Sequence, residues 1–249
     1  MIKIFIDPGH GGASIGASYK GRLEQDDCLR LSLAVRDILF TQKGVETMLS
    51  REDSSDPDLL ERAERANGWG ADYYISIHRN AFTPEGATGA EAWVYSAVET
   101  DGITYNMAKN IVDGVCAVTG YRNRGVKKGA PAYRDYAVNS YTKMHSCLLE
   151  VGFIDNTKDN TVFDTAFPEI AFSIAKALME NMGLTFIPPV IKGDADGDGK
   201  VTASDARLIL RAAVGLEKLD TAKGDVDGDG KITAADSRDA LRIATGQEV

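Results

Sequence analysis

Residues 1–10 read Met1-Ile-Lys-Ile-Phe-Ile-Asp-Pro-Gly-His10, and they set the frame for the rest of the chain. Residues 2–6 are apolar apart from one lysine, which is typical of a buried central strand. The Asp-Pro-Gly tripeptide ends this strand sharply, and the glycines around His10 let the backbone pass close to whatever the histidine holds. A single histidine after a strand is more often structural than functional. A catalytic role for His10 therefore requires partners elsewhere.

Two further β-rich runs end on residues that can bind a metal ion. Residues 72–78 end on His78, and residues 146–150 end on Glu150. Ligands of open α/β sheets bind at the carboxyl ends of the strands, so these side chains and His10 are expected to converge. Glu24 precedes a helical stretch and lies within loop reach of His10. Two imidazoles and a carboxylate, with one position left to water, form the ligand set of a catalytic zinc site.

The apolar pattern of the first part of the chain alternates between strands and helices. Residues 25–40 and 57–69 have helical spacing, and residues 45–49 read as a second strand. Asp56 is the candidate cap of the second helix, and Gly70 is its expected end. This β-α-β-α-β order predicts an α/β domain with a mainly parallel, twisted sheet and helices on both faces.

The later part of this domain is expected to add one strand and two helices. Residues 90–95 are predicted to form an edge strand, and residues 101–119 and 167–182 are predicted to be helical. Between them, residues 120–141 are rich in Arg, Lys and Tyr. This segment is either a solvated loop or the wall of a groove that meets the carboxylates of a ligand.

Three kinds of conspicuous residue are better explained by packing than by chemistry. Trp69 and Trp93 lie in or beside regular elements, so they are expected to pack rather than to bind sugar. The three cysteines show no Cys-x-x-Cys spacing and are expected to be free thiols. His145 begins the strand that ends at Glu150, which places it roughly 17 Å from the catalytic edge at ~3.3 Å per residue. That distance argues against a zinc site of three histidines.

The composition argues against several classes of partner. A chain of 249 residues suffices for one medium-sized domain and a small module. The formal net charge of -9 argues against nucleic acid as a partner, and against electrostatic attraction to other anionic polymers. We expect no membrane span, because no apolar run approaches the necessary length. No signal peptide is visible, so we expect that the protein either stays in the cytoplasm until the cell lyses or has lost a leader peptide.

Four sequence blocks together resemble a known enzyme family. They are Asp7-Pro-Gly-His-Gly-Gly12, Glu24, Ser76-Ile-His-Arg-Asn-Ala81 and Leu149-Glu-Val-Gly-Phe-Ile-Asp-Asn156. In this order and spacing they are similar to the signature of the zinc-dependent N-acetylmuramoyl-L-alanine amidases, over about residues 1–183. The resemblance implies that His10, Glu24 and His78 bind one catalytic zinc ion, and that Glu150 does the acid and base work.

The resemblance also implies the reaction, which is hydrolysis of the amide between N-acetylmuramic acid and the L-alanine of the stem peptide in peptidoglycan. Asp7 and Asn80 are candidates to orient the zinc-binding histidines. Arg79 departs from the many relatives that carry a neutral or apolar residue there, which bears on substrate preference. Two alternatives remain. The domain could be a zinc peptidase or another amide hydrolase on the same fold, or an inert domain beside an adhesive module.

The C-terminal part of the chain contains a duplication. Residues 184–193 include two prolines and are expected to be a short stiff linker, followed by a module over residues 194–249. Its two repeats are Asp194-Ala-Asp-Gly-Asp-Gly-Lys-Val-Thr-Ala-Ser-Asp205 and Asp225-Val-Asp-Gly-Asp-Gly-Lys-Ile-Thr-Ala-Ala-Asp236. Both match the twelve-residue calcium loop, with carboxylates at positions 1, 3, 5 and 12, a glycine at 6 and a backbone carbonyl at 7. The expected ligands of two structural calcium ions are Asp194, Asp196, Asp198, Lys200, Asp205, Asp225, Asp227, Asp229, Lys231 and Asp236.

Each loop leads into a helix, over residues 204–214 and 235–244, without an entering helix in front. The module is therefore expected to be a small all-α unit of two half EF-hands, and it resembles a type I dockerin. That resemblance implies docking to a cohesin domain of a scaffold or cell-surface protein. In dockerins, loop positions 10 and 11 help to set partner choice, and here these are Ala203-Ser204 and Ala234-Ala235. A calcium-stabilised tail and a calcium sensor are the alternatives, although a sensor needs complete helix pairs.

Overall fold

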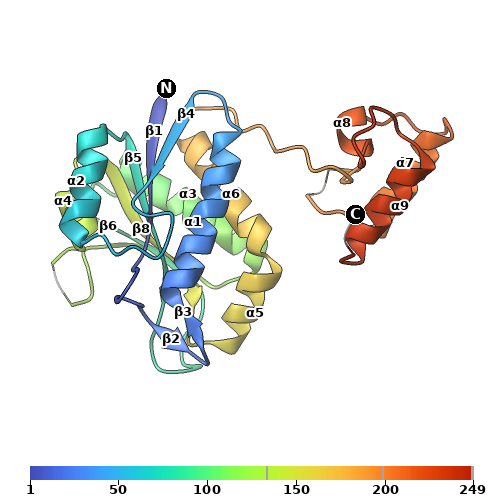
Figure 1. Ribbon diagram of the computed structural model, residues 1–249. Coiled ribbons are helices and arrows are strands. Elements are labelled where there is room, and N and C mark those ends of the chain that lie inside the picture. Colours follow the sequence, from blue (N-terminus) through green and yellow to red (C-terminus); the bar gives the residue numbers. More distant parts are fainter. Residues whose placement is uncertain (133, 198, 248–249) are drawn as a thin grey trace. The chain divides into compact units, whose positions relative to one another are not determined.

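A computed structural model describes residues 1–132, 134–197 and 199–247. The chain divides into two compact units, residues 1–187 and 188–249, which are considered separately (Figure 1). The first unit extends four residues beyond the expected boundary at residue 183. The reason is that Leu184 and Phe186 pack against its core, while the Gln42 side chain hydrogen-bonds both the N–H and the carbonyl of Ile187.

A six-stranded sheet with the order β4-β1-β5-β8-β6-β7 forms the centre of the first unit (Figure 1). The strands are β1 (Ile2–Pro8), β4 (Val45–Leu49), β5 (Tyr73–Asn80), β6 (Ala90–Val94), β7 (Asn123–Lys128) and β8 (His145–Phe153). Strands β4, β1, β5 and β8 are mutually parallel, whereas β6 runs antiparallel to β8 and parallel to β7. A separate small hairpin joins β2 (Ser18–Tyr19) to β3 (Arg22–Leu23). The predicted fold class, a mainly parallel α/β sheet, is confirmed.

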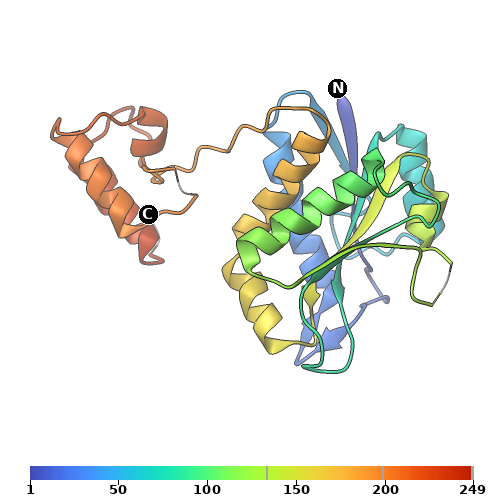
Figure 2. The same cartoon turned by 180° about the vertical axis from the view of Figure 1, so that it is seen from behind.

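Helices cover both faces of the sheet (Figures 1 and 2). The first face carries α1 (Glu24–Phe40), α3 (Ile103–Thr119) and α6 (Phe167–Asn181), and the second carries α2 (Leu59–Trp69) and α4 (Ala137–Tyr141). Helix α5 (Thr157–Thr165) follows β8. Successive side chains of a strand point to opposite faces, so Ile4 and Ile6 join the larger core while Phe5 stacks on Tyr74 in the smaller one. Burial on both faces explains the nearly continuous apolar run of β1.

The structure corrects two expectations about strands. Residues 90–95 do not form an edge strand, because β6 lies between β8 and β7. The strand at this edge of the sheet is β7, which falls in the basic segment of residues 120–141, where no strand was predicted. Only Val126 among its six residues is a large apolar residue, and its sequence therefore lacks a strand pattern.

The second helix also begins later than expected. Asp58, not Asp56, is the N-cap of α2, and its side chain accepts hydrogen bonds from the N–H groups of Leu60 and Glu61 at 2.9 and 2.8 Å. Gly70 ends the helix with a left-handed φ of 72°, as predicted.

A buried ion pair connects β1 to α2. Arg62 Nη1 lies 2.7 Å from Asp7 Oδ1, and the same carboxylate accepts hydrogen bonds of 2.6 Å from Ser50 and Ser76. Burial alone raises the pKa of Asp7, but the charge of Arg62 and these hydrogen bonds outweigh it, so the pKa lies below its usual value. Arg62 also donates to the carbonyl of His10 at 2.7 Å. The pair thus fixes the loop that carries His10.

The second unit is helical, as predicted. Helices α7 (Ala203–Ala213) and α9 (Ala234–Ala244) each follow a calcium-like loop, and α8 (Thr221–Gly224) lies between the repeats. A capping box begins each longer helix, formed by Thr202 with Asp205 and by Thr233 with Asp236. Its described buried apolar residues are Ala195, Ala206, Ile209 and Ala240, and five partly buried apolar residues pack against them.

Replacement of Asp7 by Asn is expected to destabilise the first unit by roughly 3–5 kcal/mol, because it removes the buried counter-ion of Arg62 and leaves only the partly exposed Asp56 at 3.6 Å. Both tryptophans, Trp69 and Trp93, lie in the first unit, so urea unfolding of the full chain followed by tryptophan fluorescence reports this unit alone. Asp101→Asn, at an exposed site, is the matched control. Equal stability of the two variants would contradict a structural role for the pair.

The same substitution has a predictable pH dependence. Because the folded-state pKa of Asp7 is lowered, its contribution to stability is present above the ordinary value of 3.8 and is lost as the pH falls through the lowered pKa. The stability difference between the wild type and Asp7→Asn should therefore shrink in acid.

Candidate metal centre and active site

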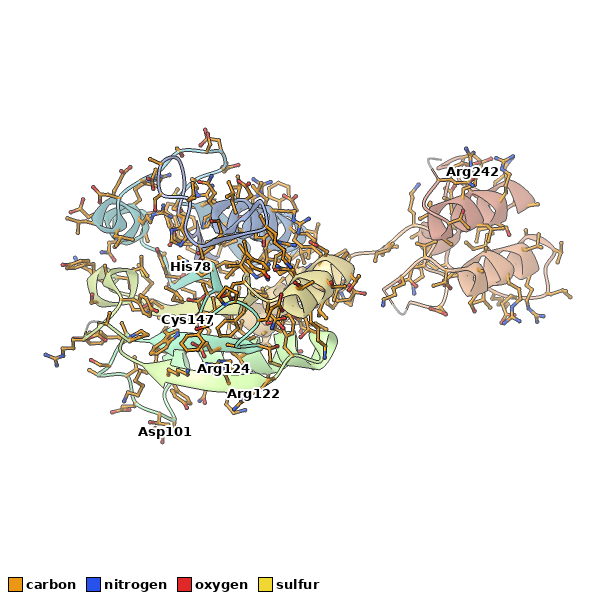
Figure 3. All side chains as sticks on the ribbon, turned by 90° about the horizontal axis from the view of Figure 1, so that it is seen from below. His78, Asp101, Arg122, Arg124, Cys147 and Arg242 are labelled. Atoms are coloured by element: carbon orange, nitrogen blue, oxygen red, sulfur yellow. The ribbon has the colours of Figure 1, made fainter. Side chains whose placement is uncertain are left out.

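The carboxyl ends of three neighbouring strands bring the predicted catalytic residues to one cleft. His10 follows β1, His78 lies on β5 and Glu150 lies on β8, directly opposite His78 in the strand register. Figure 3 shows the order across the sheet, with His78 on β5, Cys147 on β8 and Arg124 on β7. The cleft has a volume of about 560 Å³ and is lined by both histidines and both glutamates.

Glu24 lies between the two histidines. Its Oε1 atom is 3.2 Å from His10 Nε2 and 3.0 Å from His78 Nδ1, and the ligand atoms of the three residues all lie within 4.8 Å of one another. A Cβ on Gly9 would lie only 2.4 Å from the His78 ring, so a glycine is required for this approach. His10, Glu24 and His78 thus form a group that could hold a metal ion.

The first turn of α1 and the loops around it hold Glu24 as a carboxylate. Its Oε2 atom accepts a hydrogen bond from Ala17 N at 2.7 Å, and Oε1 accepts one from Arg79 N at 3.1 Å. Burial raises the pKa of Glu24, but the hydrogen bonds from His10 and His78 outweigh burial, so the pKa is lowered. A charged glutamate at the first position of a helix is also favoured by the helix dipole.

Glu150 is in the opposite electrostatic situation. It is buried, and its Oε2 atom has no hydrogen-bond partner among the described residues. Burial, together with the negative charges of Glu24 and Glu91, raises its pKa well above the usual range. It lies outside the group of possible metal ligands. Glu24 and Glu150 thus lie near each other with pKa values pushed apart, so the two carboxylates suit different roles.

Glu91 is a buried residue of this region that the sequence did not reveal. It pairs with Glu150 in the register of β6 and β8, and its carboxylate accepts hydrogen bonds from Asn80, Trp93 and Arg124 at 3.0, 3.1 and 2.6 Å. Lys127 Nζ lies 2.8 Å from the same carboxylate. Burial raises the pKa of Glu91, but Lys127 and Arg124 outweigh it and the pKa is lowered. The sequence feature that could have revealed a buried Glu91 is its position as the one charged residue in the apolar stretch of residues 90–94.

The side chains of Asp7 and Asn80 bind partners other than the histidine rings. Asp7 binds Arg62 and two serines, and the Asn80 side chain donates to Glu91 and accepts from the N–H of Ala81. Neither orients a histidine ring by a hydrogen bond among the described residues, so that expectation is corrected. The group beside the His10 ring is Ser14, whose Oγ lies 3.3 Å from Nδ1.

Arg79 supports the helix that carries Glu24. The residue is buried, its Nη1 atom donates to Asp27 of α1 at 2.5 Å, and its guanidinium lies 4.1 Å from the centre of the Phe163 ring. Arg79 is also among the residues that line the cleft, so its bearing on substrate preference stays a prediction. Its side chain connects the end of β5 to the first turn of α1.

His145 and the tryptophans have packing roles, as expected. His145 begins β8, at the far end from Glu150, and its Nδ1 atom lies 2.7 Å from Thr104 Oγ1. Lys3 Nζ lies 5.2 Å from the centre of the Trp69 ring, and Trp93 packs edge to face against Tyr136. The three cysteines are free.

The second unit contains two further groups of possible metal ligands. They are Asp194, Asp196 and Asp205 in the first loop, and Asp225, Asp227 and Asp229 in the second. The predicted ligand Asp198 lies outside the described residues. Asp205 and Asp236 are fully buried and accept hydrogen bonds from the loop backbone and from the capping threonines. The carbonyl ligands at Lys200 and Lys231 remain predictions.

The fold and the site define a class of protein. An α/β sheet presents two histidines and a charged glutamate as a possible metal centre, and a second glutamate with a raised pKa lies beside them. This is the arrangement of a metal-dependent hydrolase.

Comparison with known proteins identifies the family. The model of the N-acetylmuramoyl-L-alanine amidase family matches residues 4–180, so the chain belongs to this family. The model of the dockerin type I domain matches residues 192–242. The described residues contain no helix with the length and apolar character needed to span a membrane.

Curated relatives and solved structures agree with this assignment. The N-acetylmuramoyl-L-alanine amidase CwlM of Bacillus licheniformis is 39% identical over 160 residues, 64% of this chain and 59% of CwlM. The sporulation-specific amidase of Bacillus subtilis (strain 168) is 36% identical over 167 residues, 67% of this chain and 62% of that protein. This chain thus spans about three fifths of the length of both relatives. The amidase structure from Clostridium difficile 630 has a TM-score of 0.67 and 28% identity, covering 73% of this chain and 97% of that one.

The geometry predicts which residues are needed for metal binding. Glu24→Ala removes the carboxylate between the two histidines and should lower zinc affinity by more than about 100-fold. His145→Ala should leave zinc affinity unchanged, because His145 lies at the opposite end of β8. Zinc titration of both variants in the full chain checks this ranking. The reverse ranking would establish a different ligand set.

Proposed function

We propose that the first unit hydrolyses the amide bond between the lactyl group of N-acetylmuramic acid and the L-alanine of the stem peptide in peptidoglycan. The observation that carries the proposal is the convergence of His10, Glu24 and His78 beside Glu150, which is not part of the ligand group. The names of the curated relatives support the same reaction. The protein would accordingly act on the bacterial cell wall.

The donor atoms fit a single zinc ion. His10 Nε2, His78 Nδ1 and Glu24 Oε1 would hold it, because two imidazole nitrogens and one carboxylate oxygen are a common ligand set of catalytic zinc. Glu24 is already charged in this environment, which suits a dication. Zinc in such a site supplies Lewis acidity, which polarises a substrate carbonyl and makes water a stronger acid.

Glu150 is the proposed proton carrier. Its carboxylate would accept a proton from the attacking water and return that proton to the nitrogen of the departing alanine. The raised pKa favours the first of these steps, because it makes the Glu150 carboxylate a stronger base toward the attacking water. The unpartnered Oε2 atom leaves this carboxyl group free to exchange protons rather than to hold a neighbour.

Substrate recognition is proposed to use the basic strand β7. Arg124 and Lys127 both bind Glu91, yet their side chains remain 25% and 34% exposed. Of the basic segment 120–141, these two side chains are the ones proposed to meet the carboxylates of a stem peptide. Glu91 would then fix the position of the two cations.

We further propose that the second unit binds two calcium ions and docks to a cohesin domain on a scaffold or cell-surface protein. Clustered carboxylate oxygens are the ligands that calcium prefers, and the two Asp groups supply them. The dockerin match supports the partner class. Exposed Leu210 and Leu241 occupy equivalent positions on α7 and α9 and are candidates for the docking surface.

Glu150→Gln tests the catalytic assignment. The amide cannot accept a proton, so hydrolysis should fall by about 10³-fold while zinc content and fold are retained. Turnover of purified muropeptides, analysed by mass spectrometry, together with metal analysis measures both effects. Loss of zinc from this variant would show that Glu150 is a ligand. Wild-type products cleaved within the stem peptide would instead identify a peptidase.

Calcium removal tests the second assignment. In calcium-depleted buffer with zinc maintained, the second unit should loosen, because the carboxylates of each loop repel one another without an ion. Calcium at about 100 times its dissociation constant should stabilise that unit by about 2.7 kcal/mol per site. Calorimetry of the full chain follows both units, and tryptophan fluorescence follows the first. One transition that moves as a whole with calcium would contradict independent units.

A further inference from the structure

A lysine and a glycine precede both calcium-like loops. Lys192-Gly193 leads into Asp194 and Lys223-Gly224 leads into Asp225, so the duplication extends two residues upstream of each loop. The calcium loop itself needs neither residue, since its ligands begin at the aspartate. The repeated lysines therefore require a separate explanation.

The lysines lie against each other's loops. A Cβ atom placed on Gly197 of the first loop would be 2.6 Å from Lys223 Nζ, and one placed on Gly228 of the second loop would be 3.2 Å from Lys192 Nζ. Gly197 and Gly228 hold the same position, the fourth, in their loops. Each repeat thus places its ammonium group over the loop of the other repeat. The hydrogen bond from Gly193 N to Lys223 O, at 2.7 Å, joins the two lysine segments directly.

The two glycines next to the ammonium groups bind proposed calcium ligands. The N–H of Gly197 donates to Asp194 Oδ1 at 2.8 Å, and that of Gly228 donates to Asp225 Oδ1 at 2.7 Å. Within the described residues, neither lysine makes an ion pair of 4.0 Å or less with a carboxylate. The ammonium groups therefore contribute charge to the loops without occupying the oxygens that would bind the ion.

We propose that Lys192 and Lys223 are reciprocal counter-charges that set the calcium affinity of the second unit, an inference that rests on the proposed calcium binding. Each positive charge offsets the repulsion among the loop carboxylates and so stabilises the metal-free unit. The same charge repels an incoming dication, so it lowers calcium affinity. Because each lysine acts on the opposite repeat, metal-free folding of one loop depends on the presence of the other.

The test replaces each lysine in the full chain and measures calcium binding by isothermal titration calorimetry. Lys223→Gln and Lys192→Gln should each raise the calcium affinity of one site by about fivefold, and each should lower the melting temperature of the calcium-free second unit. The affinity gain should shrink at high salt, because salt screens exposed charges. Lys223→Met keeps most of the aliphatic stem and should behave like Lys223→Gln, which separates charge from packing.

Lys218→Gln is the matched control, since Lys218 is an exposed lysine of the same unit. It should change calcium affinity by less than about twofold, as expected of a distant screened charge. An equal effect of Lys218→Gln and Lys223→Gln would reduce the observation to general electrostatics and overturn the proposal.

A second comparison tests reciprocity. With the second loop disabled by Asp225→Ala, Lys223→Gln should still raise the affinity of the remaining first loop, whereas Lys192→Gln should not. With Asp194→Ala the ranking should reverse. An effect of each lysine on its own loop would overturn the proposal. A wild type that binds two calcium ions without any influence of the lysines would overturn this inference alone, and a wild type that binds no calcium would overturn the proposed calcium function as well.

Discussion

The catalytic edge depends on the buried ion pair between Asp7 and Arg62. The backbone at His10 has a φ of 62°, a left-handed conformation that a residue with a side chain adopts only under constraint. Arg62 supplies this constraint, because its guanidinium donates to Asp7 and to the carbonyls of Pro8 and His10. A buried ion pair is a poor source of net stability, since desolvation offsets its attraction. Its contribution here is to fix the geometry of the loop that carries His10, because a planar guanidinium binds several acceptors at once.

Three buried carboxylates at the same edge differ in the donors around them rather than in their burial. Glu24 accepts two backbone N–H groups and faces two histidines, and Glu91 faces two cations. Glu150 keeps one oxygen without a hydrogen-bond partner among the described residues. Desolvation raises the pKa of all three, and only the first two receive enough compensation to reverse it. This difference supports the proposal that Glu150, rather than Glu24 or Glu91, transfers the proton.

The sequence predicted the strand ends well, because the carboxyl-edge rule needs only the order of strands and helices. From that order alone, the sequence predicted that His10, Glu24, His78 and Glu150 converge on one site. It missed β7, since an edge strand whose side chains bind a buried glutamate shows no apolar alternation. It also gave no sign of the contacts of Arg79, because nothing in the local sequence shows that Asp27 and Phe163 cover its side chain. Both features depend on contacts between segments far apart in the chain.

The two kinds of proposed metal site differ in how the chain builds them. The ligands of the first site come from three segments and are held by a large core, so that unit can fold before a metal ion arrives. The ligands of each calcium loop lie within twelve residues, which is why the sequence shows them directly. The fully buried apolar residues described in that unit are Ala195, Ala206, Ile209 and Ala240, with five partly buried apolar side chains packed against them. Such a small core stabilises little by burial, so we expect ion binding to supply part of the folding free energy there. A bound metal ion is thus proposed to serve catalysis in the first unit and folding in the second.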